Sequence, residues 1–279
     1  MLISIIITCI FFCQVQSLTK IQSVIPRIHP PHKNVRGRII GGDEATPHAY
    51  PYQVGLSINE GMSLCGGSLI SSNYVLTAAH CAIVISTVEV ILGAHNVTEN
   101  ETTQIRLQGK EIKIHDQYDA RLHRNDIALI KLNFSVPLTF AIQPVKIPSA
   151  SQAEKTYDDL FSVATGWGLV EDKSLPTIND MSDTLQVLSV PIMNVDICGE
   201  YYNDDEATYI TTSNLCTSGY KNKGTCKGDS GGPLVYDGTL IGISSIGSTR
   251  CEECYPSIYT RVGAYLDWIK NNSDVIIEF

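Results

Sequence analysis

Basic side chains are scarce in this 279-residue sequence, which has 20 Lys and Arg against 29 Asp and Glu and a formal net charge of −9. Phosphate contacts need a basic surface, so this balance argues against a nucleic-acid partner. The sequence also lacks internal repeats and low-complexity tracts, and its 21 Gly and 12 Pro exclude a collagen-like chain. With 43% hydrophobic residues, the chain can bury a sizeable core.

Long hydrophobic runs are missing after residue 17, where none reaches the roughly 18 residues of a membrane-spanning helix. At the N-terminus, Leu2 to Cys13 is almost wholly apolar and has the length of a signal-peptide core. The small residues Val15 and Ser17 suit a cleavage site. We therefore expect residues 1–17 to be a signal peptide, the protein to be secreted and no membrane to be a partner; a buried apolar strand or an anchor is the alternative.

Acidic residues are absent from residues 18–38, which carry five basic residues, three prolines and no hydrophobic periodicity. Such a segment is extended and accessible to proteases. Without it, residues 39–279 hold 15 basic against 29 acidic side chains, net −14. The leader ends at Arg38, and cleavage there would give Ile39 an ammonium group able to pair with a buried carboxylate. The sequence thus predicts an activation propeptide whose removal acts as a switch.

Cysteine is not scarce, but its count of nine is odd. Cys9 and Cys13 leave with the expected signal peptide, and the remaining seven can form disulfides in a secreted protein. The same compartment permits glycosylation, for which four Asn-X-Ser/Thr sequons are candidates at Asn96, Asn100, Asn133 and Asn271.

The body of the chain alternates short β-rich runs with Gly, Pro, Asn and Asp, a pattern typical of an all-β sandwich or barrel. Helical character is confined to a turn near Ala78–Cys81 and the stretch Val262–Asn271. No linker interrupts residues 39–279, so we expect one compact body. Examples of the expected strands are Tyr52–Ile58, Ser68–Leu76, Val88–Leu92, Ile127–Leu132, Leu185–Pro191, Pro233–Tyr236 and Leu240–Ser245.

Three local motifs carry chemistry: TAAHC around His80, NDIAL around Asp126 and GDSGGP around Ser230. A serine hydroxyl is a weak nucleophile that needs an imidazole to take its proton, and the imidazole needs a buried carboxylate to fix its tautomer. The flanking glycines let backbone amides of Gly228 and Ser230 approach a developing oxyanion. Taken singly, a core histidine, a strand-capping aspartate and a turn serine are common structural features, but the three together with Arg38 favour catalysis.

On these motifs, residues 39–279 resemble the chymotrypsin/trypsin family of serine endopeptidases. The resemblance implies two six-stranded antiparallel β-barrels, with the active site in the cleft between them and a short C-terminal helix. It implies that His80 is the general base, Asp126 its orienting carboxylate and Ser230 the nucleophile. Asp229 would receive the Ile39 ammonium.

The resemblance also identifies residues that would bind substrate. Ser245-Ile246-Gly247 matches the strand that pairs with substrate backbone, with Ile246 where the family has Trp. The pocket base carries Gly224 beside Thr225, and Ser257 lies on the opposite wall, so no carboxylate awaits Lys or Arg there. We therefore expect a neutral pocket for Leu, Met, Phe or Tyr, chymotrypsin-like to elastase-like. Glu252 and Glu253 lie in the adjacent loop, and whether their carboxylates attract basic substrate residues stays open.

Disulfide pairing is also implied by the family. Cys65 would pair with Cys81, and Cys198 with Cys216. Cys226 would pair with Cys251 or Cys254, the sequence alone leaving both open and the family-like distance favouring Cys251. Cys254 is then the odd thiol.

No metal and no cofactor are expected, because no Cys/His cluster has zinc-ligand spacing and Ala94 stands where trypsins have a calcium-binding Glu. The expected partners are protein or peptide substrates, an activating trypsin-like protease and protein protease inhibitors, and we expect a monomer. The likeness to arthropod chymotrypsin-like and collagenase-like digestive proteases implies a digestive role. A processing protease of haemolymph, saliva or venom and a non-catalytic binding relative are the alternatives.

Overall fold

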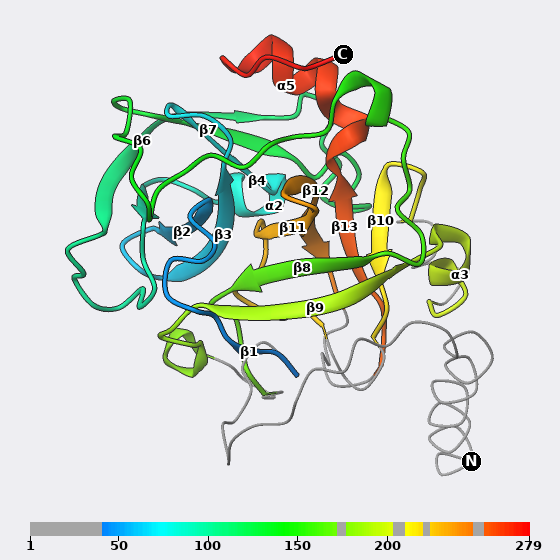
Figure 1. Ribbon diagram of the computed structural model, residues 1–279, viewed down its shortest axis with the longest axis horizontal. Coiled ribbons are helices and arrows are strands. Elements are labelled where there is room, and N and C mark those ends of the chain that lie inside the picture. Colours follow the sequence, from blue (N-terminus) through cyan, green and yellow to red (C-terminus); the bar gives the residue numbers. More distant parts are fainter. Residues whose placement is uncertain (1–40, 172–176, 203–209, 220–223, 248–253) are drawn as a thin grey trace.

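The computed structural model describes residues 41–171, 177–202, 210–219, 224–247 and 254–279. Two antiparallel β-barrels make up most of this part of the chain, one after the other in sequence (Figure 1). The two expected helical segments are present: α2 spans Ala79–Ala82, and the C-terminal stretch divides into η3 (Val262–Tyr265) and α5 (Leu266–Asn272). No helix in the described ranges is long and apolar enough to cross a membrane.

The first barrel closes through antiparallel neighbours in the order β2-β3-β4-β7-β6-β5. Its interior is filled by aliphatic side chains such as Leu56, Leu76 and Leu129, each at most 1% exposed. Burying this apolar surface is the main stabilising contribution to the barrel. Its strands are β2 (Gln53–Ile58), β3 (Ser63–Leu69), β4 (Tyr74–Thr77), β5 (Val88–Leu92), β6 (Ile105–Ile114) and β7 (Ala128–Leu132).

The second barrel runs β9-β10-β13-β12-β11-β8 and closes because β8 also pairs with β9. The short strand β1 (Asp43–Glu44) adds to its outside by pairing with β9. The two closed six-stranded barrels and the short C-terminal helix confirm the expected fold class. The strands are β8 (Phe161–Gly166), β9 (Gln186–Met193), β10 (Asn214–Thr217), β11 (Pro233–Tyr236), β12 (Thr239–Ile246) and β13 (Ser257–Arg261).

The expected single strand Ser68–Leu76 is wrong. β3 ends at Leu69 and β4 begins at Tyr74, and the four residues between them form a hairpin turn in which the Ile70 and Ser71 N–H groups donate to the Tyr74 carbonyl. The sequence there is Ile-Ser-Ser-Asn, and serine and asparagine favour turns by bonding their own backbone: the Asn73 N–H donates to Ser71 Oγ at 3.1 Å.

Glycine at position 66 lets the barrels approach. A Cβ added to Gly66 would lie 2.7 Å from the Gly232 Cα, closer than side chains tolerate. The Gly66 N–H instead donates to the Ser230 carbonyl at 2.7 Å. This contact fixes the Ser230 loop of the second barrel against strand β3 of the first.

Minor elements connect the strands. They are η1 (Ala150–Gln152), η2 (Ile178–Asp180) and α3 (Val195–Gly199), whose N-terminus is capped by the Asn194 side chain accepting from the Asp196 and Ile197 N–H groups.

Candidate active site

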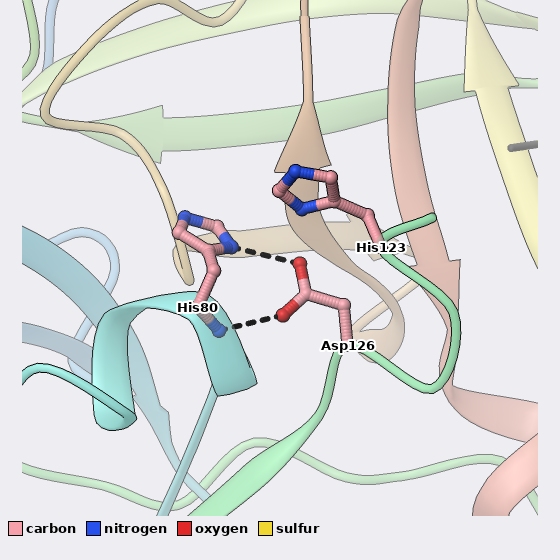
Figure 2. Close-up of side chains that lie close together, drawn as sticks. All are labelled: His80, His123 and Asp126. Atoms are coloured by element: carbon pink, nitrogen blue, oxygen red, sulfur yellow. Dashed lines mark hydrogen bonds and ion pairs between the residues drawn. The ribbon is translucent and has the colours of Figure 1, made fainter. Parts of the chain in front are cut away.

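His80 and Asp126 come from two adjacent strand ends of the first barrel. His80 lies in α2 directly after β4, and Asp126 lies two residues before β7, which pairs with β4. The pairing therefore brings the two side chains together, and His80 Nδ1 lies 2.8 Å from Asp126 Oδ2 (Figure 2). The His80 backbone N–H also donates to Asp126 Oδ1 at 2.8 Å, which holds both residues in one geometry.

The Asp126 carboxylate is fully buried, and both of its oxygens accept hydrogen bonds. Besides the two donors from His80, Ser245 Oγ donates to Asp126 Oδ2 at 2.5 Å. Burial acts to raise the pKa of Asp126, but the hydrogen bonds from His80 and Ser245 outweigh it and hold the pKa below its usual value. An ionised carboxylate bonded to Nδ1 leaves His80 Nε2 as the imidazole atom that faces outward to accept a proton.

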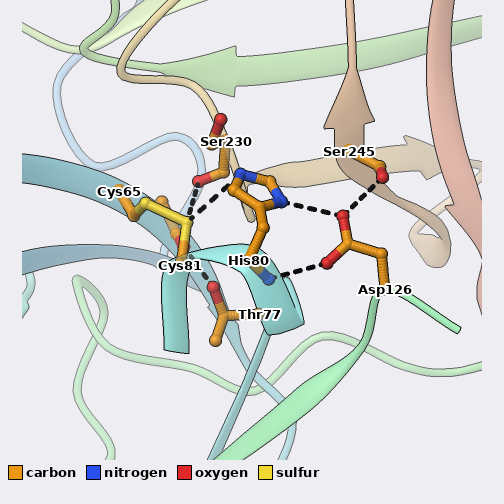
Figure 3. Close-up of a disulfide and its surroundings, with 8 residues drawn as sticks. Cys65, Thr77, His80, Cys81, Asp126, Ser230 and Ser245 are labelled. Carbon is orange, nitrogen blue, oxygen red and sulfur yellow. Dashed lines mark hydrogen bonds and ion pairs between the residues drawn. A yellow bond between two sulfur atoms is a disulfide. The ribbon is translucent and has the colours of Figure 1, made fainter. Parts of the chain in front are cut away.

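Ser230 reaches the site from the second barrel, in the turn before β11. Figure 3 shows it beside the His80 ring, on the side away from Asp126. The Cys81 sulfur touches both residues, since it lies 3.7 Å from His80 Nε2 and 3.6 Å from the Ser230 carbonyl oxygen. His80, Asp126 and Ser230 thus lie together where the two barrels meet, with the Cys65–Cys81 disulfide against His80 and Ser230.

The structure shows no hydrogen bond from Ser230 Oγ to His80 Nε2, both of which are described. Such bonds commonly tighten only when substrate binds, and a rotation about one side-chain torsion of the serine changes this distance. Among the described residues, the N–H groups of Gly228 and Ser230 donate to no acceptor. Gly228 has a φ of 97°, which glycine tolerates. Two uncommitted donors flanking the serine are what an oxyanion would need.

Asp229 points the other way, into the protein, and is 1% exposed. Its oxygens accept the Gly168 N–H at 2.8 Å and the Cys226 N–H at 2.9 Å. Gly166 and Gly168 leave it room, because a Cβ on either would collide with the carboxylate. Burial raises the pKa of Asp229 to about 6, and the two backbone donors offset only part of that rise. Its expected partner Ile39 and the cleavage residue Arg38 lie outside the described residues.

The residues expected at the pocket base face one another and are neutral. A Cβ on Gly224 would lie 2.9 Å from Ser257 Oγ, and Thr225 Oγ1 lies 3.4 Å from the buried Tyr259 hydroxyl. A Cβ on Gly247 would meet nothing closer than the Thr225 carbonyl at 3.7 Å, so this position leaves the approach open. Glu252 and Glu253 lie outside the described residues.

The expected substrate-pairing segment ends strand β12. Ser245 is buried, but its hydroxyl is committed to Asp126, which the sequence did not reveal. Ile246 pairs with Ile258 of β13 and packs near the Cys198–Cys216 disulfide rather than projecting as a large aromatic wall.

Two disulfides join described residues, Cys65–Cys81 and Cys198–Cys216. Cys226 is also disulfide-bonded, and its favoured partner Cys251 lies outside the described residues. The four sequons differ in accessibility. Asn100, Asn133 and Asn271 are exposed, whereas Asn96 is half-buried and its Oδ1 accepts from the Thr98 hydroxyl at 2.8 Å.

Sequence reasoning missed His123, whose ring lies edge-to-face against that of His80 with centroids 5.9 Å apart. Burial lowers the pKa of His123, although Asp126 acts in the opposite direction. No motif marks this histidine, and only its position three residues before Asp126 could have drawn attention to it.

Similarity to known proteins shows the family to which the chain belongs. The family model described as trypsin matches residues 39–269. The chain is 42% identical to brachyurin of Leptuca pugilator, over 85% of this chain and 99% of that relative. It is 35% identical to a chymotrypsin of Phaedon cochleariae, over 88% of this chain and 86% of the relative. A solved structure of HL collagenase superposes with a TM-score of 0.74 and 31% identity, covering 86% of this chain and all of the other. The chain therefore belongs to the trypsin family and is a serine protease.

Proposed function

We propose that this protein is a secreted, digestive serine endopeptidase made as a zymogen, with residues 1–17 as signal peptide and 18–38 as propeptide. The observation that carries the proposal is the bond from His80 Nδ1 to the buried Asp126, with Ser230 on the other side of the His80 ring. The Cys81 sulfur lies against both His80 Nε2 and the Ser230 carbonyl oxygen. The family model, which begins at residue 39, supports Ile39 as the first residue of the mature enzyme.

Each group has one part in the reaction. Ser230 Oγ attacks the carbonyl carbon of the scissile peptide while His80 Nε2 takes the hydroxyl proton, and Asp126 stabilises the imidazolium. The N–H groups of Gly228 and Ser230 stabilise the oxyanion. His80 then gives its proton to the leaving amine, which departs. Water repeats the sequence on the acyl-enzyme and releases the acid and free Ser230.

The pocket favours uncharged residues before the scissile bond. Gly224, Thr225 and Ser257 present no carboxylate, and a lysine or arginine side chain placed there would be a buried, unpaired cation. We therefore expect cleavage after Leu, Met, Phe or Tyr. A peptide library digested by the cleaved enzyme measures this, and dominant cleavage after Lys or Arg would show that the argument from these three residues is wrong.

A serine-directed organophosphorus reagent tests the function itself. It should label Ser230 in the enzyme cleaved after Arg38 and abolish peptidase activity. Ser230→Ala should lose both labelling and roughly 10⁶-fold of kcat. Ser189→Ala, which removes an exposed hydroxyl from β9, is the matched control and should keep both. Full activity in Ser230→Ala would refute the proposal.

A further inference from the structure

His123 lies at the active site without a part in the proposed reaction. Figure 2 shows its imidazole and that of His80 around the Asp126 carboxylate. One potential ligand atom from each of these three residues lies within 4.8 Å of the other two. Among the described residues this is the one group of three or more His, Cys, Asp or Glu side chains placed so closely.

The loop that carries His123 is held by its own hydrogen bonds. Asp119 Oδ1 accepts the Arg121 N–H at 2.9 Å, and Asn125 Nδ2 donates to the Gln117 carbonyl at 2.8 Å. Tyr265 of η3 donates its hydroxyl to Asn125 Oδ1 at 3.1 Å. His123 itself has a left-handed φ of 48°. The loop therefore presents the imidazole to the site from a defined backbone position.

The Nδ1 atom of His123 is buried and has no hydrogen-bond partner within the described part of the chain. Buried polar atoms in folded proteins are generally satisfied, so an unpartnered imidazole nitrogen aimed into a site of two other ligand-type groups points to a ligand that completes it. Imidazole nitrogen is the donor that zinc-class divalent cations prefer together with thiolate and carboxylate.

We propose that His80 and His123, with the negative charge of Asp126 beside them, bind Zn²⁺ or a similar borderline cation and that this binding inhibits the enzyme. The inference rests on the proposed function, since the inhibition acts on the His80 base. Zinc holds imidazole nitrogens at about 2.0–2.1 Å, which places tetrahedral ligands about 3.4 Å apart. The separations between the ligand atoms, now up to 4.8 Å, have to shorten by up to about 1.4 Å, and a rotation of the partly exposed His123 side chain would supply this.

Inhibition follows from the imidazole lone pairs. A metal ion bound at His80 Nδ1, the nitrogen that faces Asp126, takes the lone pair there, so the proton of that nitrogen moves to Nε2 or is released to solvent. His80 then no longer donates to Asp126, and the positive charge of the metal keeps the ring from accepting the serine proton. Removal of the metal lets the proton return to Nδ1 and restores the base. Calcium prefers six to eight oxygen ligands and should not compete.

The first experiment measures inhibition. Enzyme cleaved after Arg38 is titrated with ZnCl₂ against a peptide substrate, with CaCl₂ in parallel and a chelator added at the end. We expect reversible inhibition by Zn²⁺ alone. In His123→Asn the inhibition constant should rise at least about tenfold, relative to that variant's own zinc-free rate, because loss of even an outer partner of a metal costs about 10–100-fold in affinity.

His48→Asn is the matched control. Like His123, His48 has a left-handed φ, here 61°, and a buried Nδ1 without a hydrogen-bond partner among the residues described, but it contacts Phe140 and not the His80 group. Asparagine tolerates this backbone conformation in both variants. Zinc inhibition in His48→Asn should equal that of the unmodified enzyme. Equal inhibition of all three proteins would overturn the site.

A second measurement does not depend on catalysis. Calorimetric titration of cleaved Ser230→Ala protein with ZnCl₂ should show one site, and adding His123→Asn should weaken it at least about tenfold. If the cleaved protein with Ser230 intact lacks peptidase activity while the Ser230→Ala protein binds zinc through His123, the proposed function is refuted and the metal site is kept. An active enzyme that neither binds nor responds to zinc would refute the metal site alone.

Discussion

The two buried aspartates of the site differ in what stabilises their charge. Asp126 has an imidazole and a serine hydroxyl as donors, and its pKa lies below the usual value. Asp229 has only two backbone N–H groups, and none of the ion pairs among the described residues includes it. Within the described part of the uncleaved chain, Asp229 is thus a buried acid without a cation, and a new ammonium group would relieve that state.

This difference predicts how the stability of the uncleaved chain depends on pH. The pKa of Asp229 is about 6 when folded and near 3.8 when unfolded, so the folded state holds the proton more tightly. The free energy of unfolding should therefore fall as pH rises from about 4 to about 6, by about 3 kcal/mol relative to Asp229→Asn. Urea unfolding of both proteins in a Ser230→Ala background measures it.

Asp237→Asn controls for the loss of one carboxylate, because Asp237 is exposed in the turn between β11 and β12 and already has the left-handed φ, 47°, that asparagine tolerates. If the unmodified chain and Asp229→Asn lost stability in parallel across this pH range, the buried acid would not carry the effect.

Sequence reasoning succeeds at single residues where the chemistry is local. His80, Asp126 and Ser230 each stand in a short motif with its own glycines or strand, so they could be selected without a structure. The hydroxyl of Ser245 on Asp126 and the ring of His123 against His80 could not, because they depend on how a loop and a strand far apart in sequence fold onto the same carboxylate.

At the scale of elements, strands delimited by local turn residues could be predicted, whereas strands that depend on distant pairing could not. The runs Val88–Leu92 and Pro233–Tyr236 were predicted with the bounds observed for β5 and β11, because turn residues delimit them. The hairpin inside Ser68–Leu76 was missed because its turn begins with Ile70, which reads as strand. Strand β6 was not among the runs singled out from the sequence, because its apolar alternation is interrupted at Gly109–Glu111; pairing with β5 and β7 stabilises it as a strand.

The two described disulfides join elements at nearly equal loop lengths, with sequence separations of 16 and 18. Of these two, only Cys65–Cys81 contacts His80 and Ser230, whereas Cys198–Cys216 ties α3 to β10. The two disulfides therefore reduce the entropy of the unfolded chain by about the same amount but differ in their distance from His80 and Ser230.

Removing either bridge by a double Cys→Ala change should lower the free energy of unfolding by about 3 kcal/mol, since loops of this length contribute about that amount. Only the Cys65/Cys81 variant should also lose kcat, because its sulfur holds the His80 ring against the Ser230 loop. Urea unfolding and steady-state kinetics of the cleaved enzymes separate the two effects. An equal loss of kcat in both variants would contradict this positioning role.

At the scale of the whole molecule, the site exists only where the barrels meet. The first barrel supplies His80 and Asp126, and the second supplies Ser230, Asp229 and the facing pair Gly224 and Ser257. The bond from the Gly66 N–H to the Ser230 carbonyl crosses that boundary. We therefore expect a rearrangement of the second barrel near Asp229 to change the position of Ser230 and its activity while His80 and Asp126 stay in place.

Cleavage after Arg38 is the change that this arrangement predicts. Incubation with trypsin should activate the intact chain, because the freed Ile39 ammonium pairs with Asp229. An uncompensated buried charge costs about 3–5 kcal/mol, so activity should differ by about 10²- to 4 × 10³-fold between the two forms. Arg38→Gln should stay at the low level after trypsin treatment. Lys33→Gln, which removes another basic residue from the leader, should activate like the unmodified chain. N-terminal sequencing shows whether Ile39 leads the active form, and high activity in trypsin-treated Arg38→Gln would mean that the switch lies elsewhere.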